Sequence, residues 1–199
     1  MDRQVFDAVR ILLKGGHSYP SLSVATIAET AEVARSTFYV HFADKTELLI
    51  RLASETTADI FDAANEWVEG SILQVDSASG REALLATCRR IVADYREHSA
   101  VLSAVMAAAA TDSAVADYWF QRIDAFAELA TIKLRKSQAA GLVDESVDAR
   151  SLAQMAAWSI ERTVSQTVSH SSVENDEQLA ATLARGLWLM IFGDSPLPR

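Results

Sequence analysis

Apolar residues recur every three or four positions along almost the whole chain, which is the spacing of one buried face on an α-helix. Near the start, Val5, Val9, Leu12 and Leu13 follow this spacing, and the glycine pair at 15–16 ends the helix. Glycine and proline are scarce, seven and three in 199 residues, and no segment has convincing strand alternation. The pattern predicts an all-α protein of about nine helices.

Two of the predicted helices are very short and almost adjacent. Ser23 places a capping hydroxyl ahead of the first, over 23–31, and the second covers 34–40. Asp44 then caps a further helix, and Glu47 three residues later completes a capping box. Two short helices between longer neighbours are typical of a helix-turn-helix.

The later helices are longer and amphipathic, so they can bury their apolar faces only against one another, in a bundle. With a polar loop over 71–80, their expected ranges are 44–70, 81–96, 99–110, 112–141, 148–169 and 176–192. We therefore expect a three-helix domain with the helix-turn-helix over residues 1–46 and a helical-bundle domain over residues 47–199.

Composition narrows the class of protein. Half of the residues are hydrophobic, which argues against intrinsic disorder. Cys88 is the single cysteine, so neither an internal disulfide nor a cysteine-rich zinc site is possible. The first residues lack the basic and apolar segments of a signal peptide, and no apolar window reaches the roughly 18 residues of a membrane span. These features predict a cytoplasmic protein with no membrane partner.

The formal net charge of −9 argues at first against a nucleic-acid partner, because phosphates repel acidic surfaces. The charge is unevenly distributed. Residues 1–52 carry six basic and six acidic side chains and are neutral, whereas residues 53–199 carry twelve basic and twenty-one acidic ones. The whole excess therefore lies outside the helix-turn-helix, where it disfavours non-specific DNA binding.

In a helix-turn-helix the second short helix lies in the major groove, where base edges are distinguishable. Hydroxyl and guanidinium groups are suited to this helix because they hydrogen-bond to phosphates and bases. The residues expected on its outward side are Arg35, Ser36, Thr37, Tyr39 and His41. Periodicity alone leaves open the alternative of a surface helical hairpin with ordinary polar residues.

The sequence of this region strongly resembles the DNA-binding region of the TetR family of transcriptional repressors. The residues that carry the resemblance are Ile27-Ala28, Thr37-Phe38-Tyr39, His41-Phe42, Asp44-Lys45 and Glu47-Leu48. It implies phosphate contacts from Ser23 and Thr26, base contacts from Arg35, Ser36 and Thr37, and backbone contacts from Tyr39, His41 and Lys45. Phe38 and Phe42 lie four residues apart, opposite the reading side, and are expected in the core.

Two positions depart from the family pattern. The family usually has glycine in the turn and serine at the N-cap of the second helix, where this chain has Glu32 and Ala34. We expect Glu32 to adopt a left-handed conformation without the freedom of glycine. Ala34 offers no capping oxygen, a loss of roughly 1 kcal/mol.

The C-terminal part is similar to the group of the mycobacterial ethionamide-resistance repressor. The similarity is carried by Val115–Trp119, Ile123, Phe126, Glu161-Arg162-Thr163, Leu187-Trp188 and Phe192–Asp194. In that group a largely apolar tunnel takes hydrophobic ligands. The matching positions here are Leu84, Thr87, Ile91, Tyr95, Trp119, Ile123, Phe126, Ala130, Ala157, Ile160, Glu161, Val164 and Trp188. From composition alone, the alternative is that these aromatic residues are ordinary core.

Glu161 and Arg162 are expected to pair with each other or with a ligand. For Arg162 the alternative is an ordinary ion pair on the helix surface.

The resemblance implies that residues 1–46 are the DNA-binding domain and that residues 47–199 are the ligand-binding and dimerisation domain, with a dimer built from the last two helices of each subunit. A two-fold dimer matches a palindromic operator with half-sites about one DNA turn apart. The candidate interface residues are Leu152, Met155, Ser159, Thr163, Leu183, Leu187 and Met190. A monomer that buries these residues internally is the alternative.

The function expected from these features is a ligand-responsive repressor that binds its operator as a homodimer and is released by a hydrophobic small molecule. No cofactor, metal or catalytic residue is expected, because the four histidines are scattered and no glycine-rich phosphate loop occurs. An enzyme is therefore the weakest alternative. The other alternative is a small-molecule or lipid-binding helical protein that does not bind DNA.

Overall fold

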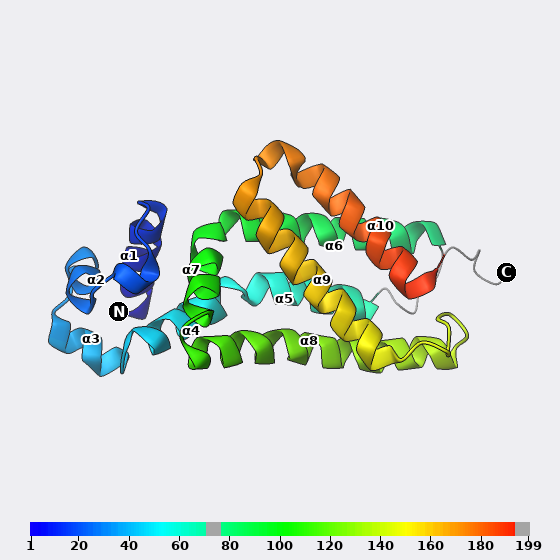
Figure 1. Cartoon of the computed structure of the whole chain (residues 1–199), viewed down its shortest axis with the longest axis horizontal. Helices are drawn as coiled ribbons and strands as arrows, with labels where there is room; N and C mark the ends of the chain where they lie inside the picture. Colours follow the sequence, from blue (N-terminus) through cyan, green and yellow to red (C-terminus); the bar gives the residue numbers. More distant parts are fainter. Residues whose placement is uncertain (71–76, 194–199) are drawn as a thin grey trace. The chain divides into compact units, whose positions relative to one another are not determined.

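The computed structural model describes residues 1–70 and 77–193 (Figure 1), and these ranges contain ten α-helices, two short 3-10 helices and no strand. The all-α prediction is therefore confirmed. The helices are α1 (Asp2–Lys14), α2 (Val24–Thr30), α3 (Arg35–His41), α4 (Lys45–Thr56), α5 (Ala58–Gly70), α6 (Ser77–Glu97), α7 (Ser99–Ala109), α8 (Ser113–Ala139), α9 (Ala149–His170) and α10 (Asp176–Phe192), with 3-10 helices at Tyr19–Ser21 and Val173–Asn175.

The chain divides into two compact units. The first contains Met1–Ala58 and His98–Phe120, and the second contains Asp59–Glu97 and the chain from Gln121 onward. We call them the head unit and the bundle unit. The predicted functional boundary between residues 46 and 47 is a different division, and it stays a prediction.

The head unit is built around a small aromatic core. α1 packs on α2 and α7, α2 packs on α3, and α4 packs on α7. Phe42 is fully buried, with its ring centroid 6.0 Å from that of Phe6 and 5.3 Å from that of Phe38. The Arg51 guanidinium lies 4.7 Å from the same ring, which adds a cation–π contact. These contacts hold the short α3 against the longer helices (Figure 1).

Two helix starts in the head unit follow the predicted capping chemistry. The Ser23 side chain accepts a hydrogen bond from the Thr26 N–H at 3.0 Å, which caps α2. Asp44 accepts from the Glu47 N–H at 2.8 Å, while the Glu47 carboxylate reaches back to the Ala43 N–H at 2.8 Å. Both caps are confirmed, although Glu47 bonds one residue before the N-cap.

The turn between α2 and α3 contains the predicted strained residue. Glu32 has a φ of 55°, and it is the non-glycine residue with positive φ in the described ranges. Ala34 is the N-cap of α3 and makes no side-chain capping hydrogen bond. Both departures from the family pattern therefore have the structural consequences expected from the sequence.

Replacing Glu32 with glycine is expected to stabilise the protein by about 0.5–1 kcal/mol. The left-handed conformation costs a side-chain-bearing residue roughly 1–2 kcal/mol, and the extra backbone entropy of glycine offsets part of the gain. Thermal unfolding followed by circular dichroism should show an increase of about 1–4 °C. The exposed, helical Glu29 provides the matched control, because E29G should lower the midpoint. An unchanged or lower midpoint for E32G would contradict the strain argument.

The sequence-based expectation of one helix from Asp44 to Gly70 is wrong. α4 ends at Thr56, Thr57 has φ −96° and ψ 0°, and α5 begins at Ala58. The buried Thr57 hydroxyl donates to the Ala53 carbonyl oxygen at 2.8 Å. The predicted start of the next helix at residue 81 is also late, since α6 begins at Ser77, and residues 71–76 of the predicted loop lie outside the described ranges.

In the bundle unit α10 packs along α6 and against α9, and α9 also packs on α6 (Figure 1). α9 begins with a cap in which Asp148 accepts from the Ser151 N–H at 2.7 Å. Gly141, with a φ of 73°, follows α8 as the predicted stop. Within residues 1–70 and 77–193, no single helix meets the length and apolarity of a membrane span; α7 and α8 do so only as a bent pair, on length and composition.

Candidate DNA-reading helix and effector cavity

α3 presents a polar face to solvent and an aromatic face to the core. Arg35, Ser36 and Tyr39 are exposed, the Tyr39 side chain at 52%, whereas Phe38 and Phe42 are fully buried as predicted. Thr37 and His41 are half-buried at the edge of this face. The exposed side therefore combines one guanidinium with several hydroxyls, as a helix that reads DNA requires.

Ser23 and Thr26 bond to each other at the start of α2. Their hydroxyl oxygens are 2.8 Å apart, and the Thr26 N–H also donates to the Ser23 oxygen. Each hydroxyl keeps additional hydrogen-bonding capacity, since a hydroxyl offers one donor and two acceptor positions. Their contact with phosphate stays a prediction.

Lys45 has a structural role that the sequence analysis missed. Its ammonium donates to the carbonyl oxygens of Leu22 at 2.5 Å, Pro20 at 3.2 Å and Tyr19 at 3.4 Å. Burial lowers the pKa of Lys45, and the Tyr19 hydroxyl donates in return to the Lys45 carbonyl oxygen at 2.6 Å. A phosphate contact by this side chain therefore requires it to exchange or share these carbonyl partners.

His41 is held in place by the first turn of α1. Its Nδ1 lies 2.8 Å from an Asp2 carboxylate oxygen, and Arg51 bonds to the other oxygen of the same carboxylate. Arg51 also donates to the His41 carbonyl oxygen at 2.9 Å. Although burial raises the pKa of Asp2, Arg51 and the hydrogen bonds from His41 and Arg51 bring it below its usual value. The cluster fixes the end of α3 relative to α1 and α4.

A second carboxylate, Asp112, joins the start of α8 to α4. The Thr46 hydroxyl donates to Asp112 Oδ2 at 2.5 Å, and the Ala114 N–H donates to Oδ1 at 3.0 Å. The Thr46 hydrogen bond is the main reason that the pKa of Asp112 lies below its usual value. The same side chain thus caps α8 and tethers it to the helix that follows the reading helix.

Replacing Asp112 with alanine is expected to lower the melting temperature by about 2–4 °C at pH 7, since a lost N-cap costs about 1 kcal/mol. Because folding lowers the pKa of Asp112, its stabilisation is present above the unfolded pKa of about 3.9 and disappears as pH falls through the folded pKa. Melting curves at pH 7, 5 and 3 should show the difference from wild type shrinking only below pH 4. The exposed Asp117 in α8 is the control, because D117A should have little effect at any pH. A pH-independent loss in D112A would contradict this account.

The bundle unit contains two adjoining, partly open apolar cavities of about 40 Å³ each. Four residues line both of them: Ala64, Ile91, Phe126 and Ile160. Thr87 and Cys88 are the lining residues with polar side-chain atoms in the first cavity, and Tyr95 and Glu161 are those in the second. We call these the aliphatic cavity and the Glu161 cavity.

Ten of the thirteen predicted ligand residues line one or both cavities. They are Leu84, Thr87, Ile91, Tyr95, Ile123, Phe126, Ala130, Ala157, Ile160 and Glu161. Trp119, Val164 and Trp188 are buried but are not among the lining residues. Trp119 belongs to the head unit, so its assignment to a ligand site has no support from this geometry.

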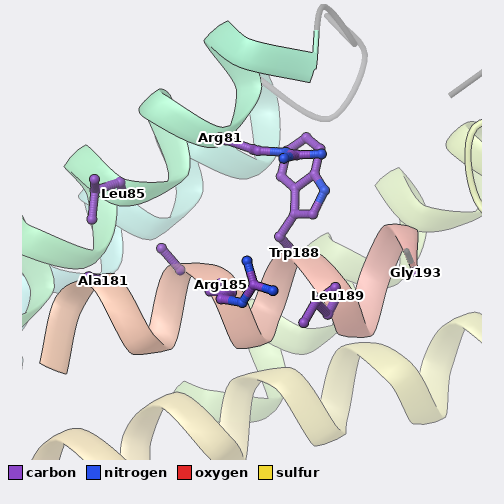
Figure 2. Close-up of a pocket in the computed structure, with 8 residues that line it drawn as sticks. Arg81, Leu85, Ala181, Arg185, Trp188, Leu189 and Gly193 are labelled. Carbon is purple, nitrogen blue, oxygen red and sulfur yellow. The ribbon is translucent and has the colours of Figure 1, made fainter. Parts of the chain in front are cut away.

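Trp188 instead lines a surface pocket of about 230 Å³ between α6 and α10. Figure 2 shows Arg81 extending from α6 to the Trp188 ring on α10, and the guanidinium carbon lies 5.0 Å from the ring centroid. The Phe192 ring is 4.4 Å from Trp188. α10 therefore contributes to both sites from different faces. Trp188 lines this surface pocket, whereas Leu187 and Ile191 line the aliphatic cavity.

Glu161 and Arg162 leave α9 on different sides. Glu161 is 5% exposed and lines its cavity, whereas Arg162 is exposed. Burial, and then the nearby Glu161 carboxylate, raise the pKa of Tyr95 above its usual value. The exposure of Arg162 favours the ordinary surface role that the sequence left open for it.

Sequence reasoning missed the contribution of α5 to the cavities. The lining residues from α5 are Ile60, Phe61, Ala64 and Val68. The sequence analysis placed them in one long helix over residues 44–70 and gave them no role in a ligand site. Their spacing of about four residues was a usable signal for one buried face. This spacing predicts that one face of α5 is buried, but it does not predict which helices or cavities that face meets.

The predicted dimer residues are unevenly exposed. Met155 is 53% exposed and Thr163 is exposed, while Ser159, Leu183 and Met190 are half-buried. Leu152 and Leu187 are almost fully buried by their own chain, which leaves them little surface for a partner subunit. Leu187 also lines the aliphatic cavity, so the burial of these two residues gives their place in the interface no support, and the interface stays a prediction.

An exposed polar second helix in a helix-turn-helix, together with a helical bundle that contains apolar cavities, is typical of a DNA-binding regulator that binds a ligand. The C-terminal domain model of the transcriptional regulator EthR matches residues 84–193, and the model of the tetR family of bacterial regulatory proteins matches residues 13–52. The first match alone covers more than half of the chain. The chain belongs to the TetR family of transcriptional regulators and has a C-terminal domain of the EthR type.

Solved structures of similar fold cover nearly the full chain. FadR from Bacillus subtilis, in complex with stearoyl-CoA, has a TM-score of 0.72 at 18% identity over 98% of this chain and 100% of its own. A regulator from Saccharomonospora viridis, in complex with choline, has a TM-score of 0.67 at 16% identity over 100% and 98%. A TetR-family regulator from Rhodococcus sp. has a TM-score of 0.67 at 21% identity over 96% and 98%. Among curated proteins, no match was found.

Proposed function

We propose that the protein is a cytoplasmic repressor that binds a palindromic operator as a homodimer and is released when a hydrophobic small molecule enters the bundle. The observation that carries this proposal is the pair of adjoining apolar cavities in a chain that also presents a reading helix. The family supplies the roles of DNA binding and ligand response. The two cavities supply a place for the ligand.

The small size of the cavities indicates how a ligand would act. Sites for drug-sized molecules run from about 300 to 1,000 Å³, whereas the two cavities hold about 40 Å³ each. An effector must therefore move the lining helices apart, so it binds an expanded conformation better than this one. Such differential affinity is the requirement for a ligand to shift a conformational equilibrium.

The ligand class is supported in outline by the lining. The aliphatic cavity has fourteen lining residues, of which only Thr87 and Cys88 carry polar side-chain atoms. The ligands named for the two similar structures, stearoyl-CoA and choline, differ in size and in charge. The fold therefore accommodates ligands of different chemistry, and the lining residues of this chain determine which class of ligand it binds.

The homodimer is proposed from the exposed side of the last two helices. Met155 and Thr163 on α9, with half-buried Leu183 and Met190 on α10, offer apolar and small side chains to a second copy. Since a two-fold interface uses the same patch on both subunits, it presents two reading helices to two half-sites. Sedimentation of the purified chain at micromolar concentration should give the mass of two subunits.

We do not propose an enzymatic activity. The thiol of Cys88 is buried, and burial raises its pKa to about 12, so it stays protonated at neutral pH. In the described ranges no group of three or more histidine, cysteine, aspartate or glutamate side chains is arranged to hold a metal ion. The exposed polar helix α3 and the apolar cavities are the features that a regulator requires.

The proposal is tested by a gel shift with DNA from upstream of the protein's own gene. Sequence-specific binding at low salt is expected, together with its loss in the variant T37A/Y39A. A lipid or small-molecule carrier without DNA binding would show no specific shift and would keep its ligand affinity in this variant. Absence of any specific complex with wild type would contradict the repressor proposal.

Replacing Ile160 with alanine is expected to lower stability by about 2–4 kcal/mol and the melting temperature by about 5–10 °C, because Ile160 lines both cavities. The enlarged space should bind a small apolar alcohol. Saturating 1-octanol should therefore raise the melting temperature of I160A more than that of wild type, since a ligand stabilises the state that binds it. Exposed Ile132 is the control, because I132A enlarges no cavity. Equal octanol effects in the three proteins would contradict a ligand site at Ile160.

A further inference from the structure

The surface pocket between α6 and α10 has two positively charged side chains in its lining. Arg81 of α6 and Arg185 of α10 both line it, and the described residues around it include no carboxylate (Figure 2). Arginine side chains stay charged in proteins, so both are available to an anion as cations. The pocket volume of about 230 Å³ is somewhat smaller than the range of about 300–1,000 Å³ for drug-sized ligands. The pocket is therefore large enough for a small organic anion.

Another arginine of α6 shows how a cation at this helix pair is normally neutralised. Arg89 donates to the Glu177 carboxylate of α10 through two nitrogens, at 2.8 Å and 2.5 Å. At the pocket, by contrast, the charged residue that α10 places in the same lining as Arg81 is a second arginine, Arg185. Within the described part of the chain, neither of these two forms an ion pair or a hydrogen bond. Two like charges in one pocket repel each other, and a bound anion would offset that repulsion.

Arg81 already contacts the Trp188 ring, and this contact leaves its hydrogen-bond donors available. The guanidinium carbon lies 5.0 Å from the ring centroid (Figure 2). The ring attracts the positive charge, but it gives the N–H groups no oxygen acceptor. A guanidinium has five such donors in one plane. Trp188 therefore holds Arg81 in the pocket, and the donors remain free for the oxygens of a ligand.

The remainder of the pocket lining is apolar. Leu85 of α6 lines it together with Ala181, Ala184 and Leu189 of α10, beside Trp188. The Leu189 side chain is 38% exposed, so a ligand that covers it removes apolar surface from water. An inorganic anion gains nothing from these walls. The pocket therefore favours an organic anion that has a compact hydrocarbon or aryl body.

The pocket is separate from the effector cavities and from the proposed dimer surface. Leu187 lines the aliphatic cavity from another face of α10. Side chains two residues apart on an α-helix point about 200° apart, since each residue turns the helix by about 100°. Arg185 and Trp188 therefore leave α10 on a different side from Leu183 and Met190, the α10 residues proposed for the dimer.

We propose that this surface pocket is a second ligand site, which binds a small amphipathic carboxylate through Arg81 and Arg185 and covers its apolar body with Leu85 and Leu189. The site goes beyond the proposed function, which requires only the effector cavities. A guanidinium suits a carboxylate because it can donate two parallel hydrogen bonds to the two oxygens. The formal net charge of −9 repels anions from the protein as a whole, so a preference for an anion must come from the local arginines.

The test compares three probes: 3-phenylpropionate, its neutral amide and acetate. Isothermal titration calorimetry measures their binding to the full chain in chloride buffer at 0.15 M salt, for wild type and for the variants R81Q and R185Q. The control variant R135Q removes the same charge from an exposed position on α8, outside the pocket. Melting curves check that each variant is folded.

Wild type is expected to bind 3-phenylpropionate at least tenfold more tightly than either the amide or acetate. R81Q and R185Q should each lower the affinity for 3-phenylpropionate at least fivefold, whereas R135Q should stay within twofold of wild type. Equal binding of the acid and the amide by wild type would overturn the inference, and this comparison needs no variant. An unchanged affinity for the acid in either R81Q or R185Q would overturn it as well.

The variant I160A separates the surface pocket from the effector cavities. Ile160 lines both cavities but not the pocket, so I160A should bind 3-phenylpropionate as wild type does. Tighter binding by I160A would place the probe in the effector cavities and overturn the inference. The proposed function is tested by operator DNA and this site by the carboxylate alone. A protein that binds the carboxylate as expected but no operator would therefore contradict only the proposed function.

Discussion

Replacing both Arg35 and Tyr39 with alanine should lower operator affinity by at least a hundredfold. Both side chains are exposed on α3, and each base or phosphate contact of this type is worth about 1–3 kcal/mol. Neither residue supports the fold strongly, although the Tyr39 ring lies 5.4 Å from that of Phe38. Fluorescence anisotropy with labelled operator DNA measures the affinity, and a melting curve checks that the protein is folded.

The control for this double variant removes a cation from outside the reading face. Lys14 is exposed at the end of α1, so K14A changes the net charge as R35A does. Affinity within about threefold of wild type is expected for K14A, as long as long-range attraction is screened at 0.15 M salt. A hundredfold loss in K14A, or none in the double variant, would show that α3 is not the reading helix.

The second large effect is on stability. Replacing Phe42 with alanine is expected to cost about 3–5 kcal/mol, as for other fully buried phenylalanines. The ring contacts Phe6, Phe38 and Arg51 at once, so its removal leaves a cavity at the junction of α1, α3 and α4. Thermal unfolding should show a decrease of about 10 °C or more, and operator binding should be lost because α3 loses its support.

The exposed Ile11 on α1 provides a comparison in the same unit. I11A removes an apolar side chain that is already in contact with water, and its effect should stay within about 0.5 kcal/mol. If F42A and I11A lowered the melting temperature equally, the aromatic cluster would not be the core of the head unit.

Local rules predict much of the head unit from the sequence alone. Ser23 and Asp44 cap their helices because a short side-chain oxygen ahead of an apolar run has few other uses. Glu32 adopts a left-handed conformation because the turn requires it whatever the residue. Each of these features depends on residues within a few positions of one another, which is why one sequence is enough to predict them.

Features that depend on distant residues were predicted less well. Nothing local marks the break at Thr57, since the apolar spacing continues through it without glycine or proline. The positions of Trp119 and Trp188 depend on which neighbour each helix face meets, and resemblance alone does not show that neither residue lines the two cavities. Lys45 reads as a phosphate ligand from its motif, but its carbonyl partners lie more than twenty residues away in the sequence.

Several basic side chains of the head unit are already paired within the chain. Arg10 is paired with Asp7 and Glu55, Arg51 with Asp2, and Lys45 with backbone carbonyls. These intramolecular contacts leave few cations to neutralise phosphates, and each phosphate contact contributes about 0.9 to the slope of log K against log salt. A shallow salt dependence is therefore expected, with specificity carried by the polar side chains of α3.

The most direct test of the central claim is selection from a random library of DNA duplexes by the purified wild-type protein, with the bound duplexes sequenced after several rounds. If α3 reads the major groove in a two-fold dimer, the selected duplexes should share a palindrome whose half-sites are about one helical turn apart. The variant R35A/Y39A, selected in parallel, should enrich nothing. Failure of folded wild-type protein to enrich any sequence at low salt would contradict the account.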